Sequence, residues 1–125
     1  MNSLRILLVD DFAAWRSYVR LVLKEREVFE VVGEAADGQD AIEKATQVHP
    51  DLVVMDVAMP KMNGIEAARH IRESAPNVKI LFLSVEPFDE LVETILAVGG
   101  QGYLRKSEVG SKLLPLIDNL FGKSE

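Results

Sequence analysis

The most constraining feature of the sequence is a short apolar run that ends in one carboxylate. Leu, Val, Val and Met occupy residues 52–55, Asp56 follows them, and the chain then enters a loop that contains Pro60 and Gly64. A continuous apolar run of this length predicts a strand buried on both faces, as in a parallel sheet covered by helices. Ligands bind beyond the carboxyl ends of such strands, so Asp56 is a candidate functional residue.

Other segments typical of strands recur along the chain and alternate with segments of helical spacing. One of them, 29–35, is of mixed polarity and is expected nearer an edge of the sheet. We predict strands at 4–9, 29–35, 52–56, 78–84 and 102–106, and helices at 13–25, 40–48, 65–74, 90–98 and 111–121. Alternating strands and helices form βαβ units with right-handed crossovers. The expected fold is therefore an α/β three-layer sandwich around a five-stranded parallel sheet with five helices, in one domain of 125 residues.

Three local signals set the expected limits of the helices. Proline is tolerated only in the first turn of a helix, so Pro115 places the start of the last helix near Ser111 or Lys112. Asp89 is the expected N-cap of the fourth helix, with acids in its first turn. The dipeptide Asp37-Gly38 indicates a turn before the second helix.

Composition and charge exclude several classes of function. The chain is 48% hydrophobic and 27% charged, which is typical of a globular protein, and no apolar run reaches membrane-spanning length. The N-terminus lacks a signal-peptide pattern and the chain has no cysteine, so we expect a cytoplasmic protein without membrane contact. A net charge of −6 argues against direct nucleic-acid binding, which relies on clustered Lys and Arg.

Four of the predicted strands end in groups suited to a metal ion and a phosphate: Asp10 and Asp11, Asp56, Ser84, and Lys106. Parallel strands bring these ends to one edge of the sheet, where three carboxylates repel one another unless a cation neutralises them. Oxygen donors without His or Cys point to Mg²⁺. A lysine and a hydroxyl would bind phosphoryl oxygens, so the pattern predicts an aspartyl phosphate at Asp56.

The order and spacing of these groups resemble the receiver domain of two-component response regulators. The resemblance covers essentially the whole chain and rests on Asp10-Asp11, the segment 56–64 (DVAMPKMNG), Ser84 and the segment 102–106 (GYLRK). It implies a flavodoxin-like, CheY-like fold with strand order 2-1-3-4-5. It also implies a signalling domain whose only chemistry is self-phosphotransfer and autodephosphorylation, rather than an enzyme.

The terminal segments narrow the resemblance to one class of receivers. Segments 4–11 and 102–107 are similar to receivers of the NarL/LuxR type, which usually precede a helix-turn-helix DNA-binding domain. The resemblance therefore implies a role in transcription through an output domain outside this chain. The implied partners are a sensor histidine kinase or a phosphotransfer protein, and a homodimer is possible.

The resemblance assigns a role to each polar residue at the strand ends. Asp11 and Asp56 would ligate Mg²⁺ directly, the backbone carbonyl of Ala58 would be a third ligand, and Asp10 would act through water.

The remaining residues of the pattern would bind the phosphoryl group and respond to it. Lys106 would contact the phosphoryl group, Ser84 would move toward one of its oxygens, and Tyr103 would rotate inward. This switch would change the face that the last helices and strand present to partners.

Several positions depart from the usual receiver pattern. Ser107 stands where many receivers have a proline after a cis bond, so either the Lys106–Ser107 bond is cis or the loop is rearranged. Val85 is bulky beside Ser84 and can slow the chemistry at Asp56. Gly100 should loosen the turn before the last strand.

Two other functions account for part of the pattern. Val85, Ser107 and Pro115 favour a receiver-like interaction module that phosphorylation does not control. A phosphohydrolase of the haloacid dehalogenase kind would need a second Asp two residues after its nucleophile, and position 58 is Ala.

Overall fold

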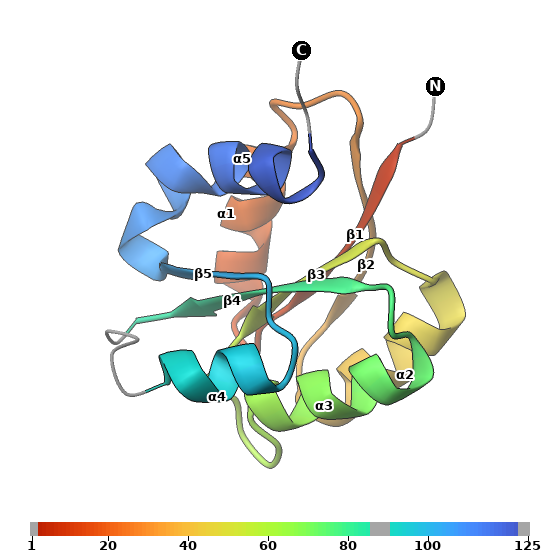
Figure 1. Ribbon diagram of the computed structural model, residues 1–125. Helices are drawn as coiled ribbons and strands as arrows, with labels where there is room; N and C mark the ends of the chain where they lie inside the picture. Colours follow the sequence, from red (N-terminus) through yellow and green to blue (C-terminus); the bar gives the residue numbers. More distant parts are fainter. Residues whose placement is uncertain (1–2, 86–90, 123–125) are drawn as a thin grey trace.

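Five parallel strands form the central layer of the computed structural model, which describes residues 3–85 and 91–122 (Figure 1). The strands are β1 (Leu4–Val9), β2 (Phe29–Ala35), β3 (Leu52–Asp56), β4 (Lys79–Ser84) and β5 (Gly102–Arg105). They pair in the order β2-β1-β3-β4-β5, and every pair is parallel. The predicted fold and strand order are confirmed.

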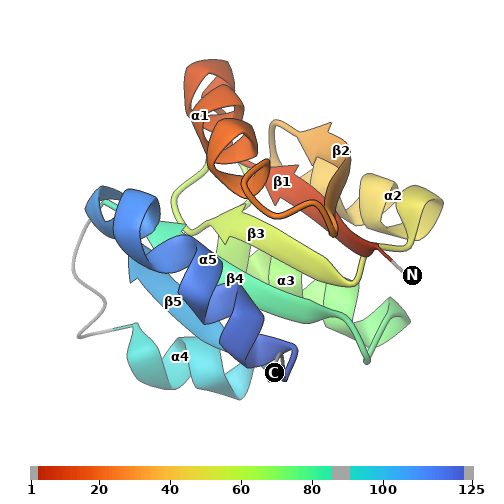
Figure 2. The same cartoon turned by 90° about the horizontal axis from the view of Figure 1, so that it is seen from above.

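Helices cover both faces of this sheet. They are α1 (Ala13–Leu23), α2 (Gly38–Val48), α3 (Gly64–Ser74), α4 (Val92–Ala97) and α5 (Val109–Leu120), with a short 3₁₀ turn η1 (Lys106–Glu108) before α5. Figures 1 and 2 show α1 and α5 on one face, and α2, α3 and α4 on the other. In the described parts of the chain, no helix has both the length and the apolar character needed to cross a membrane.

The two faces of the sheet have separate hydrophobic cores. In β4, Ile80 and Phe82 pack in the core under α2, α3 and α4, whereas Leu81 and Leu83 pack in the core under α1 and α5. Alternate side chains of a strand point to opposite faces, and all four are at most 2% exposed. Each side chain of this size contributes roughly 1.5–3 kcal/mol when buried. The strand ends are therefore held by a rigid double core.

The second helix begins earlier than predicted, because Asp37 is its cap. The side chain of Asp37 accepts a hydrogen bond of 2.8 Å from the Asp40 N–H, so Asp37-Gly38 is a helix start rather than a free turn. The helix ends at Val48 as predicted. His49 follows with a left-handed φ of 49° and precedes Pro50, which cannot continue the helix.

The last helix corrects a second prediction, since it begins at Val109 and holds Pro115 in its interior. The preceding turn η1 already aligns the chain, and there the Glu108 side chain accepts the Arg105 N–H at 3.1 Å. Pro115 offers no N–H to the carbonyl of Ser111. Both residues are exposed, so water can take the place of the lost hydrogen bond.

The approach to β5 corrects a third prediction. Gly100 is buried, and a Cβ there would lie 2.7 Å from Ile95 and 2.8 Å from Phe82, so this glycine permits close packing rather than loosening the turn. No peptide bond among the described residues is cis, so the Lys106–Ser107 bond is trans. The predicted cap Asp89 and the predicted helix start at residue 90 lie outside the described residues.

Candidate functional site

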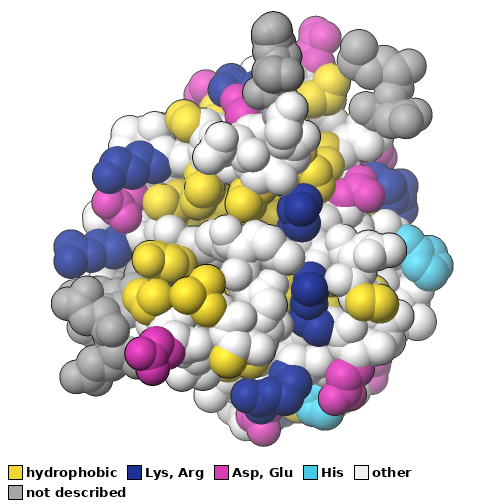
Figure 3. All heavy atoms as spheres, in the orientation of Figure 1, with side chains coloured by type: hydrophobic (Ala, Val, Ile, Leu, Met, Phe, Trp, Pro, Cys, Tyr) yellow, Lys and Arg dark blue, Asp and Glu magenta, His cyan; other side chains and the backbone are white. Residues whose placement is uncertain are grey.

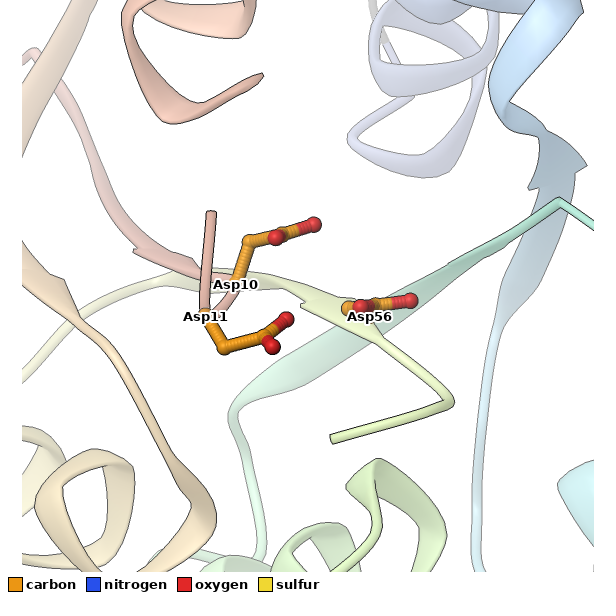
Figure 4. Close-up of side chains that lie close together, drawn as sticks. All are labelled: Asp10, Asp11 and Asp56. Carbon is orange, nitrogen blue, oxygen red and sulfur yellow. The ribbon is translucent and has the colours of Figure 1, made fainter. Parts of the chain in front are cut away.

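Three carboxylates meet at the carboxyl edge of the sheet (Figure 4). Asp10 and Asp11 follow β1, Asp56 ends the neighbouring strand β3, and each of the three offers an oxygen within 4.8 Å of the others. Asp10 and Asp56 are 3% and 5% exposed, whereas Asp11 is open to solvent. The sequence predicted this cluster, and the order of the strands produces it.

Lys106 supplies the positive charge of the cluster from the end of β5. Its Nζ lies 2.7 Å from Oδ2 of Asp10 and 3.6 Å from Oδ2 of Asp56. The lysine side chain is only 17% exposed, so the ammonium ion is held against the carboxylates rather than solvated. The ammonium group of Lys106 thus pairs with two of the three carboxylates.

Asp10 has both of its carboxylate oxygens engaged by the protein. Oδ1 accepts the Phe12 N–H at 2.8 Å, and Oδ2 accepts from Lys106. The helix α1 has Phe12 at its N-cap and no side-chain capping bond, so neither Asp10 nor Asp11 is its N-cap. Asp11 and Asp56 are the carboxylates with more capacity to bind a metal ion.

The loop after β3 wraps closely around the backbone of Asp56. The Gly64 N–H donates to the Val57 carbonyl at 2.8 Å, and a Cβ on Gly64 would lie 2.0 Å from the carbonyl oxygen of Asp56. Only glycine fits this approach. Asn63 caps α3 by accepting the Glu66 N–H at 2.8 Å, which fixes the far end of the loop. The loop also places the Ala58 N–H 3.4 Å from Oδ1 of Asp56.

Burial is the largest cause of an unusual pKa at Asp56. Together with the negative charge of Asp10 it raises the pKa of Asp56 from 3.8 to about 6, although Lys106 lowers that pKa. The charge of Lys106 therefore compensates the ionised Asp56 carboxylate only in part. A divalent cation would supply the rest of the compensating charge, and clustered carboxylates without His or Cys are the donors that suit Mg²⁺.

Ser84 and Tyr103 lie on the two strands beyond Asp56. Leu83 pairs with Asp56, so Ser84 stands one residue further toward the carboxyl edge, between β3 and β5, and is 6% exposed. The ring of Tyr103 on β5 is 39% exposed and therefore lies outward in this structure.

The whole arrangement is that of a known signalling family. The sequence matches the response regulator receiver domain over residues 6–118. The chain belongs to this family. Receiver domains are signalling domains rather than classical enzymes. They interact with histidine kinases or phosphotransfer proteins and generally bind Mg²⁺ at an acidic pocket, where this receiver has its Asp cluster.

The curated relatives that match this receiver include a protein about twice as long and a protein of nearly the same length. It is 35% identical over 116 residues to the transcriptional regulatory protein DegU of Brevibacillus brevis, a match that covers 93% of this chain and 49% of DegU. It is 34% identical over 119 residues to the chemotaxis protein CheY of Thermotoga maritima, and that match covers 93% of this chain and 96% of CheY. The receiver thus spans about half the length of the transcriptional regulator and nearly all of CheY.

Solved structures agree in fold, and those of LuxR and NarL type agree in subclass as well. A LuxR-family response regulator from Aurantimonas sp. SI85-9A1 superposes with a TM-score of 0.92 at 33% identity, covering 97% of this chain and 86% of that one. CheY in a CheX–CheY–BeF₃–Mg²⁺ complex from Borrelia burgdorferi gives 0.89 at 27% identity, covering 96% and 90%. The resemblance to NarL/LuxR-type receivers is confirmed.

One residue of the site was missed from the sequence. Trp15 was assigned only to the apolar face of the first helix, yet Nζ of Lys106 lies 5.0 Å from the centre of its ring. Its sequence position could have indicated this contact. Trp15 lies in the first turn of α1, directly after Asp10-Asp11, and this turn lies at the same edge of the sheet as the carboxylates.

Proposed function

We propose that this receiver accepts a phosphoryl group on Asp56 from a histidine kinase or a phosphotransfer protein. The observation that carries the proposal is the constellation around Asp56, which is buried, grouped with Asp10 and Asp11, and 3.6 Å from the ammonium group of Lys106. Such a site can bind a cation and a phosphoryl group side by side.

We further propose how the residues share the binding of Mg²⁺. Asp11 and Asp56 would hold the ion directly, with the backbone carbonyl of Ala58 as a third protein ligand. Asp10 would act through water, because Phe12 and Lys106 already occupy its two oxygens. When bound, Mg²⁺ supplies the positive charge that neutralises the carboxylates and the transferred phosphoryl oxygens.

The transfer step uses the Asp56 carboxylate as the nucleophile. One of its oxygens attacks phosphorus, the P–N bond to the donor histidine breaks, and the bonding electron pair remains on the imidazole nitrogen. Lys106 would exchange its contact with the carboxylates for one with a phosphoryl oxygen. Because Asp56 is only 5% exposed, attack of water on the new acyl phosphate would be slowed.

The proposed output is a change at the face formed by α4, β5 and α5. Ser84 would move toward a phosphoryl oxygen and Tyr103 would rotate inward from its present exposed position. Figure 3 shows hydrophobic side chains gathered on this side of the molecule, where Leu96 is 61% exposed. A partner protein or a second copy of the receiver would bind there.

The downstream function that the relatives favour is control of transcription. DegU is a transcriptional regulatory protein and is about twice as long as its matched segment, so we propose that an output domain outside this receiver contacts DNA. The full reading frame of the gene tests this part of the proposal. A frame without a DNA-binding domain would contradict it.

Phosphorylation can be tested directly by mass spectrometry after incubation with Mg²⁺ and acetyl phosphate. Wild-type protein should gain the mass of one phosphoryl group, and Asp56→Asn should gain none. Asp51→Asn is the matched control, because Asp51 precedes the same strand at its other end and accepts the Arg5 N–H at 2.9 Å, so its loss should leave the gain intact.

Two results would contradict the proposal. Wild-type protein that gains no mass even at high acetyl phosphate would favour the interaction module without phosphorylation control. A gain that persists in Asp56→Asn would place the phosphoryl group on another residue.

A further inference from the structure

Trp15 contacts the site through a cation–π interaction that the proposed chemistry has not yet used. The Nζ atom of Lys106 lies 5.0 Å from the centre of the Trp15 ring, within the range of such contacts. The lysine side chain is 17% exposed, and a partly desolvated ammonium ion gains more from an aromatic face than a solvated one. The ring therefore forms one wall around the charge that faces Asp56.

No hydrogen bond from its indole N–H to the described residues fixes the position of the Trp15 ring. Its Nε1 is buried, and within residues 3–85 and 91–122 it has no hydrogen-bond partner. A buried N–H without a partner is costly, so the ring must be held at this position by its faces and edges. The contact with Lys106 is one of these interactions, and it is the one that reaches the site.

A second aromatic residue holds the ring from the helix side. The rings of Trp15 and Tyr18 are 5.2 Å apart and inclined at 43°. The Tyr18 hydroxyl packs against Gly110 of α5. A Cβ on Gly110 would lie 3.0 Å from the hydroxyl oxygen, so the absence of a side chain there permits this close contact. Gly110 is in the first turn of α5, shortly after Lys106, so the two aromatic residues connect α1 to the segment that carries the lysine.

The geometry around Lys106 makes the direction of its side chain important. Asp10 attracts the ammonium group at 2.7 Å, whereas Asp56 lies 3.6 Å away. Asp11 is a third acid beside them and is exposed, so a free lysine side chain could turn toward it and toward solvent. The Trp15 ring, 5.0 Å from the same ammonium group, is a contact that this movement would break.

We propose that Trp15 is a positioning residue for phosphoryl transfer to Asp56, acting through Lys106. Its ring would hold the ammonium ion where it can pass from the carboxylates to a phosphoryl oxygen without leaving the site. Trp15 itself would touch neither the phosphoryl group nor the metal ion. This inference rests on the proposed phosphorylation of Asp56.

The first test is the rate of phosphorylation by acetyl phosphate at saturating Mg²⁺. Trp15→Leu should lower that rate roughly 3- to 30-fold, the range expected from losing one partly buried cation–π contact. Trp15→Phe keeps an aromatic face and should restore most of the rate. Leu21→Ala is the matched control, because Leu21 lies on the same helix, is 65% exposed and should leave the rate unchanged.

A double-mutant cycle separates positioning from simple packing. If Trp15 acts through Lys106, then Trp15→Leu should cause no further loss of rate in a protein that already carries Lys106→Met. A packing role would lower the rate by the same factor in both backgrounds, and this result would overturn the inference. Urea unfolding of each variant establishes that the compared proteins are folded.

The fluorescence of Trp15 gives a second measurement, which tests whether the ring senses the ammonium group of Lys106. Trp15 is the only tryptophan of the chain, so its emission reports on this site alone. Lys106→Met should change the emission of the metal-free protein, and beryllofluoride with Mg²⁺ should change that of wild type but much less that of Lys106→Met. Emission that is the same in all of these samples would overturn the inference.

The outcomes also separate this inference from the proposed function. Wild-type protein that becomes phosphorylated, with Trp15→Leu reacting equally fast, overturns the role of Trp15 and leaves the function of Asp56 standing. Wild-type protein that gains no phosphoryl group overturns both.

Discussion

At the scale of single residues, the fold makes the ionised form of the Asp56 carboxyl group unfavourable. Burial and the neighbouring charge of Asp10 raise the pKa of Asp56 to about 6. The folded protein therefore binds a proton at Asp56 more tightly than the unfolded chain, whose carboxyl titrates near 3.8. The contribution of Asp56 to stability is fully present below pH 3.8 and is lost as the pH rises through about 6.

Replacing Asp56 should consequently stabilise the metal-free protein at neutral pH. In EDTA at pH 7.5, the free energy of unfolding of Asp56→Asn should exceed that of wild type by on the order of 2–3 kcal/mol, since one pKa unit corresponds to about 1.4 kcal/mol. At pH 4 the two proteins should be nearly equal, because Asp56 is then protonated in the folded state. Urea unfolding at a series of pH values measures this difference.

The control for this experiment is the same substitution at an exposed acid. Asp51→Asn should change the unfolding free energy little and with no comparable pH dependence, since Asp51 is exposed. A difference between Asp56→Asn and wild type that stays constant from pH 4 to pH 7.5 would show that burial does not govern this carboxylate.

Residue identities at the strand ends were predictable, whereas contacts between side chains were not. Asp10, Asp56, Ser84 and Lys106 could be grouped from the sequence because parallel strands align their carboxyl ends. The contact between Lys106 and Trp15 could not, because it depends on the side-chain conformation of both residues and on the tilt of α1.

At the scale of elements, the strands followed from the sequence better than the helix limits. Three of the five strands, β1, β3 and β4, were apolar runs buried in the sheet. The mixed polarity of β2 predicted its place at an edge, as the structure confirms. Helix starts depend on single hydrogen bonds and short turns. The cap at Asp37 and the turn η1 before Val109 each moved a start by two residues or more.

The interior proline of α5 leads to a prediction at this scale. Pro115→Ala should restore an N–H that donates to the Ser111 carbonyl and should raise the unfolding free energy by roughly 1–3 kcal/mol. Pro115 is exposed, so the change removes little buried contact. Urea unfolding at pH 7.5 measures the gain.

The comparison variant for Pro115 lies on the same helix. Lys112→Ala breaks only an exposed ion pair of 3.0 Å with Glu108 and should change stability by less than about 0.5 kcal/mol. A Pro115→Ala protein that is no more stable than wild type would contradict the expected cost of the missing hydrogen bond in α5.

At the scale of the whole molecule, the stability of both hydrophobic cores depends on the negative charge of the three carboxylates at the carboxyl edge of the sheet. Asp10 follows β1 and Asp56 ends β3, and both are interior strands of the sheet that contribute side chains to the cores on both faces. Repulsion among the carboxylates therefore opposes the packing of the entire sheet. A cation at this edge should stabilise the molecule as one unit.

Stabilisation by Mg²⁺ should accordingly depend on pH. A ligand that binds only the folded state at one hundred times its Kd adds about 2.7 kcal/mol to the free energy of unfolding. Wild type at pH 7.5 should show a gain of this order. At pH 5 the gain should be much smaller, because Asp56, with its pKa of about 6, is then mostly protonated and competes poorly for a metal ion.

Two variants distinguish Mg²⁺ binding at the three carboxylates from a general effect of ionic strength on stability. Asp11→Asn removes an acid of the cluster and should lose most of the gain, whereas Asp51→Asn should keep it. Thermal unfolding with Mg²⁺, compared with Na⁺ at equal ionic strength, measures the difference. Equal stabilisation of Asp11→Asn and wild type, or equal stabilisation at both pH values, would exclude the three carboxylates as the binding site.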